Sequence, residues 1–234
     1  QMARKFRFVI PQIPVHATAR GVNRCLLFRS GFDKAKYLKR FALVAEEEGV
    51  EIHGYCILDN HVHFLLVPLT DKALARLFLR VHTWWAMYFN AKPHRSGHLF
   101  QGRFHSCVLD ETHYWAALRY IETNPRNANI THDLAAFEHS SSAAHHLATR
   151  TDPFFLLMMD AWRRRFTPTS YREFLEESPR EQQILALLNK KGRASVQELA
   201  EKLSVSAMTI HRDLNQMAAA GLSERPEPWV RLAL

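Results

Sequence analysis

Short apolar runs along the N-terminal half of the chain predict strands. Two of these runs, Glu51 to Leu58 and His61 to Pro68, are separated only by Asp59 and Asn60, which predicts two buried strands joined by a tight turn. Earlier in the chain, the segments Val15 to Arg20 and Cys25 to Phe28 are also strand-like. Together these runs predict a sheet made from neighbouring segments.

Longer segments with apolar residues at helical spacing lie between the runs. Helices are predicted over about 31–48, where Gly49 marks the end, and over about 71–90, with an extended arm over 97–109. A further helix begins near Asp110, whose acidic first turn suits the helix dipole, and Pro125 predicts that it ends at Asn124. This order predicts an α+β fold, an antiparallel sheet with helices on one side.

Two histidines lie one residue apart within a predicted strand. Side chains alternate along a strand, so His61 and His63 share one face while Val62 and Phe64 point into the core. Two imidazoles on one rigid strand are suitable ligands for a divalent metal ion. On the residues alone, satisfied or solvent-facing histidines are the alternative interpretation.

The helix after Asp110 carries a phenol and an amide on one face. Tyr120 and Asn124 are four residues apart and therefore lie side by side, whereas Tyr114 falls about 240° round the helix from Tyr120. The helix can thus present one tyrosine and one amide to the strand with the histidines. The plainer alternative for Tyr120 is an amphipathic core residue.

These segments carry a resemblance to a known family. His61-Val-His63 on a strand, followed by Arg119-Tyr-Ile-Glu-Thr-Asn-Pro125 on a helix, resembles the single-tyrosine HUH transposases, and most of all their REP-associated tyrosine transposase branch. The stretches 10–24 and 97–104 match as well, so the resemblance runs in order over about residues 3–145. It implies a ferredoxin-like antiparallel sheet with the histidines on a central strand.

The resemblance also implies an activity. Such proteins cut and rejoin single-stranded DNA at hairpin or repeat sequences through a 5′-phosphotyrosine intermediate, without ATP. By position, Tyr120 matches the nucleophile, and His61, His63 and Asn124 match the ligands of Mg²⁺ or Mn²⁺. The chain departs from the family pattern at Asp59, where many relatives have proline, and just after Pro125. Neither departure touches the expected ligands or nucleophile.

The charge balance agrees with a polyanionic partner. The chain has 234 residues and a formal net charge of +8, with a pI near 9.6. A basic surface without a nucleic-acid partner is the alternative. Arginines among aromatic residues are candidate DNA contacts, and the resemblance places one early loop near bound DNA. The expected contacts are Arg103, Arg163, Arg164 and Arg165, together with Arg20, Asn23 and Arg24 of that loop.

The C-terminal segment has a different pattern. An amphipathic helix over 180–192 is followed by a capping box at Ser195 to Glu198, which opens a second helix, and by a third helix from Ala207 to Met217. This segment resembles the DeoR-type winged-helix family, and 224–234 is expected to form a short wing. The resemblance implies that the third helix enters a major groove of duplex DNA. The expected contacts are Ser206, Thr209, His211 and Arg212.

The sequence therefore predicts two domains, a nuclease domain over 2–178 and a winged helix-turn-helix domain over 179–234. A helical bundle used for dimerisation is the alternative for the second domain. Three cysteines without zinc-motif spacing, and no apolar run long enough to span a membrane, predict a reduced cytoplasmic setting with nucleoid association. The protein is expected to be a monomer or a homodimer.

Two rival functions remain open from the residues. One is a DNA-binding transcriptional regulator whose HUH domain is catalytically silent. The other is an RNA-binding or RNA-processing protein, which the basic surface alone permits but which leaves the tyrosine without a role.

Overall fold

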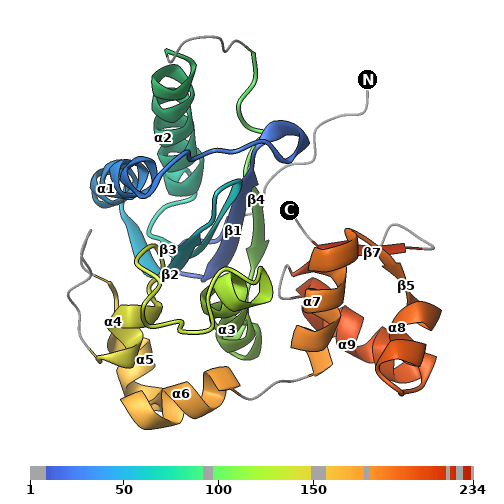
Figure 1. Cartoon of the computed structure of the whole chain (residues 1–234). Helices are drawn as coiled ribbons and strands as arrows, with labels where there is room; N and C mark the ends of the chain where they lie inside the picture. The colour runs from blue at the N-terminus through green and yellow to red at the C-terminus, as the bar shows by residue number, and fades with distance from the viewer. Residues whose placement is uncertain are drawn as a thin grey trace.

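The computed structural model describes residues 9–91, 97–148, 157–176, 180–219, 222–224 and 229–232. Its N-terminal domain is built on a four-stranded sheet of order β2-β3-β1-β4, in which every neighbouring pair is antiparallel (Figure 1). The strands are β1 (Val15–Arg20), β2 (Val50–Ile57), β3 (His61–Pro68) and β4 (His105–Val108). The central strand β3 is buried along seven of its eight residues, which explains its nearly continuous apolar sequence.

Two long helices cover one face of this sheet. They are α1 (Gly31–Glu48) and α2 (Ala73–Asn90), and both pack on Phe64 of β3. The ring of Phe64 stacks on Phe41 of α1 at a centroid distance of 3.8 Å and meets Phe78 of α2 edge-on at 6.4 Å. The element order β1-α1-β2-β3-α2-β4, with this strand order, is the ferredoxin-like arrangement, so the predicted α+β fold is confirmed.

The opposite face of the sheet is covered by α3 (Glu111–Asn127). His63 of β3 points to that face, where its ring meets Tyr120 of α3, while the neighbouring Phe64 points to α1 and α2. The expectation of helices on one side therefore describes α1 and α2, and α3 adds a layer on the other side. The reason is that β3 carries a row of side chains for burial on each face.

Two local predictions are wrong. The segment Cys25 to Phe28 is not a strand, because Asn23 and Arg24 take left-handed backbone angles (φ 49° and 60°) and the amides of Leu27 and Phe28 both donate to the carbonyl of Asp59. The short 3₁₀ turn η1 (Val22–Arg24) stands at this position instead.

The second error concerns the end of α3, which continues through Pro125 to Asn127. Proline removes one helical hydrogen bond, but the next turn stays closed because the amide of Ala128 donates to the carbonyl of Asn124 over 2.9 Å. Asn124 and Pro125 are also buried, so packing outweighs the local preference of the residue before proline.

Three shorter helices, α4 (Ser142–His146), α5 (Asp160–Arg165) and α6 (Pro168–Glu176), complete this domain. Two of them are tied to α3 through the fully buried carboxylate of Glu122. It accepts hydrogen bonds from Nδ1 of His145 (2.5 Å), from the hydroxyl of Tyr171 (2.7 Å) and from the hydroxyl of Ser141. Burial alone would raise the pKa of Glu122, but His145 and the hydroxyl donors outweigh it and lower that pKa.

The C-terminal domain is a small winged helix. Helices α7 (Arg180–Lys191), α8 (Val196–Lys202) and α9 (Ala207–Ala219) pack beside a three-stranded sheet of order β5-β7-β6. The strands are β5 (Ala194–Ser195), β6 (Ser223–Glu224) and β7 (Trp229–Leu232). The predicted cap is present, since the Ser195 hydroxyl accepts from the amide of Glu198 over 3.1 Å.

The three C-terminal helices are thus confirmed; β7 lies within the segment predicted to form the wing, and its partner β6 ends at the first residue of that segment. The predicted boundary between residues 178 and 179 lies outside the described residues. None of the described helices is both long and apolar enough to cross a membrane.

Candidate active site

The site is built on the face of β1 and β3 that α3 covers. Antiparallel pairing sets Thr18 opposite His63 and Arg20 opposite His61. Because side chains alternate, His16, Thr18 and Arg20 share one face of β1. Nε2 of His16 lies 3.1 Å from Nδ1 of His63, and the two rings stack at a centroid distance of 5.4 Å.

Helix α3 brings the phenol and the amide to these histidines. The ring of Tyr120 meets His63 edge-on at 5.2 Å and His16 at 5.9 Å. The side chain of Asn124 hydrogen-bonds both Tyr120 and His61. Only 3% of Tyr120 and 1% of Asn124 is exposed, so the group is enclosed between sheet and helix. The structure therefore brings together all four residues expected to carry the chemistry.

Burial sets the protonation of the site. It lowers the pKa of His61 to about 3, helped by the charge of Arg20, and holds the pKa of His63 well below its usual range, helped by His61 and His16. Both imidazoles are therefore neutral at physiological pH. Burial raises the pKa of Tyr120 to about 12, although the hydrogen bond from Asn124 and the charge of Arg20 act in the opposite direction. The phenol therefore holds its proton at neutral pH.

The donor set fits a divalent cation with open positions. Nε2 of His63 is buried and has no hydrogen-bond partner among the described residues, and nor do Oγ1 of Thr18 and Nε of Arg20. Nδ1 of His61 is 2.6 Å from Oδ1 of Asn60, which orients that ring. Two neutral imidazoles and one amide oxygen form an incomplete shell that leaves room for phosphate oxygens. Within the described ranges, no group of three or more His, Cys, Asp or Glu side chains is arranged to hold a metal.

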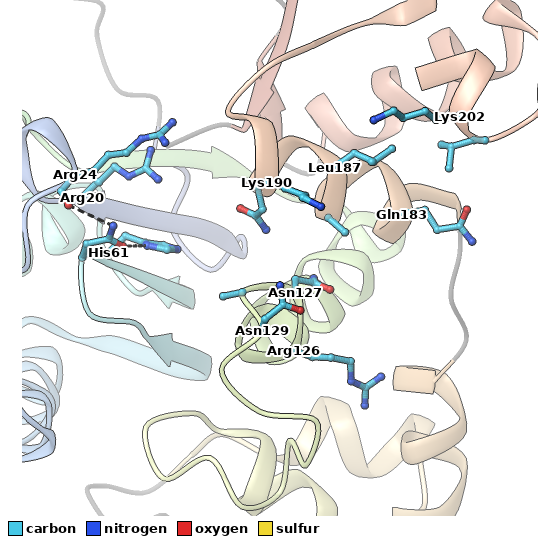
Figure 2. A pocket seen from close by; sticks show the side chains of 15 residues that line it. Arg20, Arg24, His61, Arg126, Asn127, Asn129, Gln183, Leu187, Lys190 and Lys202 are labelled. Atoms are coloured by element: carbon cyan, nitrogen blue, oxygen red, sulfur yellow. Dashed lines mark hydrogen bonds between the residues drawn. The ribbon is translucent and has the colours of Figure 1, made fainter. Parts of the chain in front are cut away.

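A cavity of about 920 Å³ opens beside the site and has His61 in its wall (Figure 2). Arg20 and Arg24 line it from the same side, the end of α3 lines it from below in the view, and α7 and α8 line it from the opposite side. Figure 2 also shows the hydrogen bonds that join Asn60 to His61 and to the loop of Arg24. Of the expected DNA contacts, Arg20 and Arg24 line this cavity. Asn23 lies between them in the chain, in the turn η1.

The other expected DNA contacts are distributed more widely. Arg103 is exposed, in the loop whose Gln101 amide donates to the carbonyl of Arg20 over 2.9 Å. The arginines of α5 lie elsewhere: Arg164 and Arg165 line a separate pocket with Glu51 and Val67, at the end of β2 and β3 remote from His61. The structure therefore does not bring Arg163, Arg164 or Arg165 to the tyrosine site.

The expected duplex contacts lie at the start of α9. The hydroxyl of Ser206 accepts from the amide of Thr209 over 3.2 Å, so Ser206 also caps this helix. His211 is exposed, whereas Arg212 borders a pocket that Arg119 of α3 also lines. Arg212 thus faces towards the N-terminal domain in this arrangement, and its role in duplex binding stays a prediction.

Sequence reasoning missed part of the site. His16 and Thr18 were not singled out, although His16 contacts His63 directly and Thr18 faces it across the strand pair. The signal was present as polar residues at alternate positions 16, 18 and 20 of an otherwise buried strand, which places them on one face. The lysines of α7 and α8 that line the cavity were also missed, because no motif marks them.

Comparison with known proteins finds a family match in each of the two parts of the chain. Residues 10–124 match the IS200-like transposase family, and residues 180–226 match the DeoR-like helix-turn-helix domain. No protein with a curated description matches the chain. A solved structure of a REP-associated tyrosine transposase bound to a REP hairpin has the same fold, with a TM-score of 0.50 and 17% identity over 60% of this chain and 82% of that chain. The chain thus carries a segment that matches the IS200-like transposase family, followed by a segment that matches the DeoR-like helix-turn-helix domain.

Proposed function

We propose that this protein cuts and rejoins single-stranded DNA at hairpin or repeat sequences, with Tyr120 as the nucleophile. The family match and the fold shared with a hairpin-bound transposase support a DNA transposition-type function. The observation that carries the finer proposal is the convergence of Tyr120, two neutral imidazoles and Asn124 in one enclosed site. A tyrosine that serves only as a core residue does not require two imidazoles and an amide beside its ring.

In the proposed cleavage, the phenolic oxygen of Tyr120 attacks phosphorus and forms a 5′-phosphotyrosine bond. The bond from phosphorus to the 3′ oxygen breaks, and that oxygen leaves as a 3′-hydroxyl after taking a proton. Rejoining is the reverse: a 3′-hydroxyl attacks the phosphotyrosine and releases the phenol. The energy of the broken bond is kept in the covalent intermediate, so no ATP is required.

His61, His63 and the amide oxygen of Asn124 would hold the Mg²⁺ or Mn²⁺ ion. When bound, the ion polarises the scissile phosphate and stabilises the charge that develops on it. His16 holds the ring of His63 through the contact between Nε2 and Nδ1, which directs the other nitrogen of His63 into the site.

Arg20 contributes a fixed positive charge. Its guanidinium lowers the pKa of Tyr120 and therefore favours the phenolate over the phenol. Nε of Arg20 has no partner among the described residues, and it can donate to a phosphate oxygen placed between Arg20 and Tyr120. The residue thus assists both nucleophile formation and phosphate binding.

The winged helix would hold duplex DNA through the start of α9, with Ser206, Thr209, His211 and Arg212 as the proposed contacts. Binding of this kind could place the nuclease domain beside a hairpin extruded from the duplex. A reaction on chromosomal DNA also implies that the protein works in the cytoplasm, in association with the nucleoid.

The test is covalent capture. The protein is incubated with labelled single-stranded hairpins from the repeats flanking its gene, with Mn²⁺, Mg²⁺ or a chelator, and run on a denaturing gel beside Tyr120→Phe. We expect a DNA–protein adduct that requires both the metal and Tyr120. Hairpin binding without an adduct under either metal would instead favour a DNA-binding regulator with a silent HUH domain.

A further inference from the structure

The cavity beside the site has two walls from different domains. Arg20, Arg24 and His61 come from the nuclease domain, while Lys190 of α7 and Lys202 of α8 come from the winged helix (Figure 2). The two walls approach each other at Gly192, where Nη2 of Arg24 would lie 3.1 Å from a β-carbon at that position. A glycine there, with φ 79°, ends α7 and lets the arginine come close.

The lining has one sign of charge. Five of its residues are Arg or Lys and none is Asp or Glu. Arg126 forms a bidentate ion pair with Glu176, with N–O distances of 2.6 and 3.1 Å, so its charge is neutralised. The four other cations have no ion pair within the part of the chain that the structure describes; they are Arg20, Arg24, Lys190 and Lys202. A cavity with this lining attracts a polyanion.

Crowding of like charges supports this conclusion. The neighbouring ammonium of Lys191 lowers the pKa of Lys202 and Lys190 adds to the effect, whereas Glu198, which is paired with Lys191, acts in the opposite direction. The folded chain therefore holds several ammonium groups close together at the rim of the cavity. A bound phosphate chain would relieve their repulsion and release counterions.

The cavity also contains polar groups suited to bases. Its lining includes the amide side chains of Asn60, Asn127, Asn129, Gln183 and Asn189. Nδ2 of Asn189 is buried and has no hydrogen-bond partner among the described residues. A buried donor without a partner is unfavourable, so a ligand acceptor oxygen or ring nitrogen that reaches it would be favoured there. Amides that donate and accept can contact the edges of unpaired bases.

We infer that this cavity is the binding groove for the unpaired DNA strand that leads to Tyr120, and that α7 and α8 of the winged helix form its second wall. The identity of the strand rests on the proposed function; the charge and position of the groove do not. His61 lies in the wall of this groove and is linked to Tyr120 through the side chain of Asn124, which hydrogen-bonds both residues. The winged helix thereby contacts single-stranded DNA through α7 and α8 as well as duplex DNA through α9.

The test measures DNA binding by the full chain carrying Tyr120→Phe, which lacks the proposed nucleophile and therefore cannot cleave the DNA. One protein adds Lys190→Gln and Lys202→Gln. Its matched control adds Lys39→Gln and Lys72→Gln, which remove the same charge from exposed positions on α1 and just before α2. Affinities for a hairpin with a single-stranded flank, and for the same hairpin without it, are measured by fluorescence anisotropy at several salt concentrations.

We expect the groove variant to bind the flanked hairpin at least tenfold more weakly than the control, and to bind the blunt hairpin as the control does. Loss of two phosphate contacts should also make the slope of log affinity against log salt shallower by about 1.4. Equal affinities and slopes for the two variants would overturn the inference. Tighter binding by the groove variant would also overturn it and would mean that the winged helix covers the site.

The outcomes for the groove and for the proposed reaction are separable. If the groove variant has a shallower salt slope than its control but the unsubstituted protein forms no adduct, the groove is supported and the cleavage proposal is refuted. If the unsubstituted protein forms an adduct but the groove variant and its control have the same salt slope, the cleavage proposal is supported and the groove is refuted. Melting temperatures of both variants, expected to match, confirm that the exposed lysines were removed without unfolding.

Discussion

Replacement of Glu122 by alanine is expected to destabilise the nuclease domain strongly. Glu122 lies on α3 between Tyr120 and Asn124, and its carboxylate accepts hydrogen bonds from His145, Ser141 and Tyr171. The substitution leaves those three buried donors without their acceptor. Removal of one partner from a buried ion pair costs about 3–5 kcal/mol. For a chain of this size that corresponds to a fall in Tm of about 6–20 °C.

The assay is thermal unfolding followed by circular dichroism, with Glu173→Ala as control. Glu173 is exposed on α6, so its loss should change stability by about 0.5 kcal/mol or less. The pH dependence gives a second readout. The pKa of Glu122 in the folded state is lowered from the ordinary 4.5, so its stabilising contribution is complete above about pH 4.5 and is lost as the pH falls through the folded pKa.

The gap in Tm between the unsubstituted protein and Glu122→Ala should therefore be full at pH 7 and narrow in acid. A Tm for Glu122→Ala within about 2 °C of the Glu173→Ala value at pH 7 would refute the reasoning, because the cluster would then add no net stability. So would a gap that widens below pH 4.5, because the sign of the pKa shift would be wrong.

Three further predictions concern the site. His16→Ala should weaken Mn²⁺ binding about 10–100-fold in titration calorimetry, because His16 orients His63; unchanged affinity would show that the contact has no such role. The rate of adduct formation should rise between pH 7 and 9, because the pKa of Tyr120 is raised to about 12 and more phenolate forms as the pH increases; a rate that falls over this range would contradict the assignment. Arg20→Gln should slow adduct formation at least tenfold in a single-turnover assay, whereas Arg165→Gln, at the remote end of the sheet, should change it less than twofold; equal effects would show that position relative to Tyr120 does not matter.

The main elements of both domains were predictable because their patterns are local. The alternation around His61 and His63 and the four-residue spacing of Tyr120 and Asn124 are properties of single elements, so the sequence places each pair on one face. The order of strands and helices then limits how the sheet can form, and the resemblance supplied its topology. The two helices after Ser195 were predictable for the same reason, because their caps and apolar spacing are local features of the sequence.

What could not be predicted depends on contacts between distant segments. The loop from Val22 to Phe28 is shaped by the Asp59 carbonyl, which lies more than thirty positions away and accepts from two of its amides. The continuation of α3 past Asn124 depends on burial at Pro125, not on local preference. The role of Glu122 requires α4 and α6 to be folded against α3, and no spacing in the sequence indicates that.

The same limit applied to the candidate site. The partner of His63 is His16, which is 47 residues away and adjacent only through the pairing of β1 with β3. Composition suggested DNA contacts at Arg163, Arg164 and Arg165, but the fold places α5 away from the tyrosine. It also sets Lys190 and Lys202 beside the cavity that His61 lines, which no motif could reveal.

The measurement that tests the central claim most directly is the mass of the peptide that carries Tyr120. The protein is reacted with a single-stranded hairpin and Mn²⁺, denatured, and digested with a nuclease and trypsin before mass spectrometry. The account predicts a nucleotide joined through phosphate to the tyrosine of the peptide spanning 120–126. A nucleotide attached to another residue such as Tyr114, or none where the DNA has been cut, would contradict it.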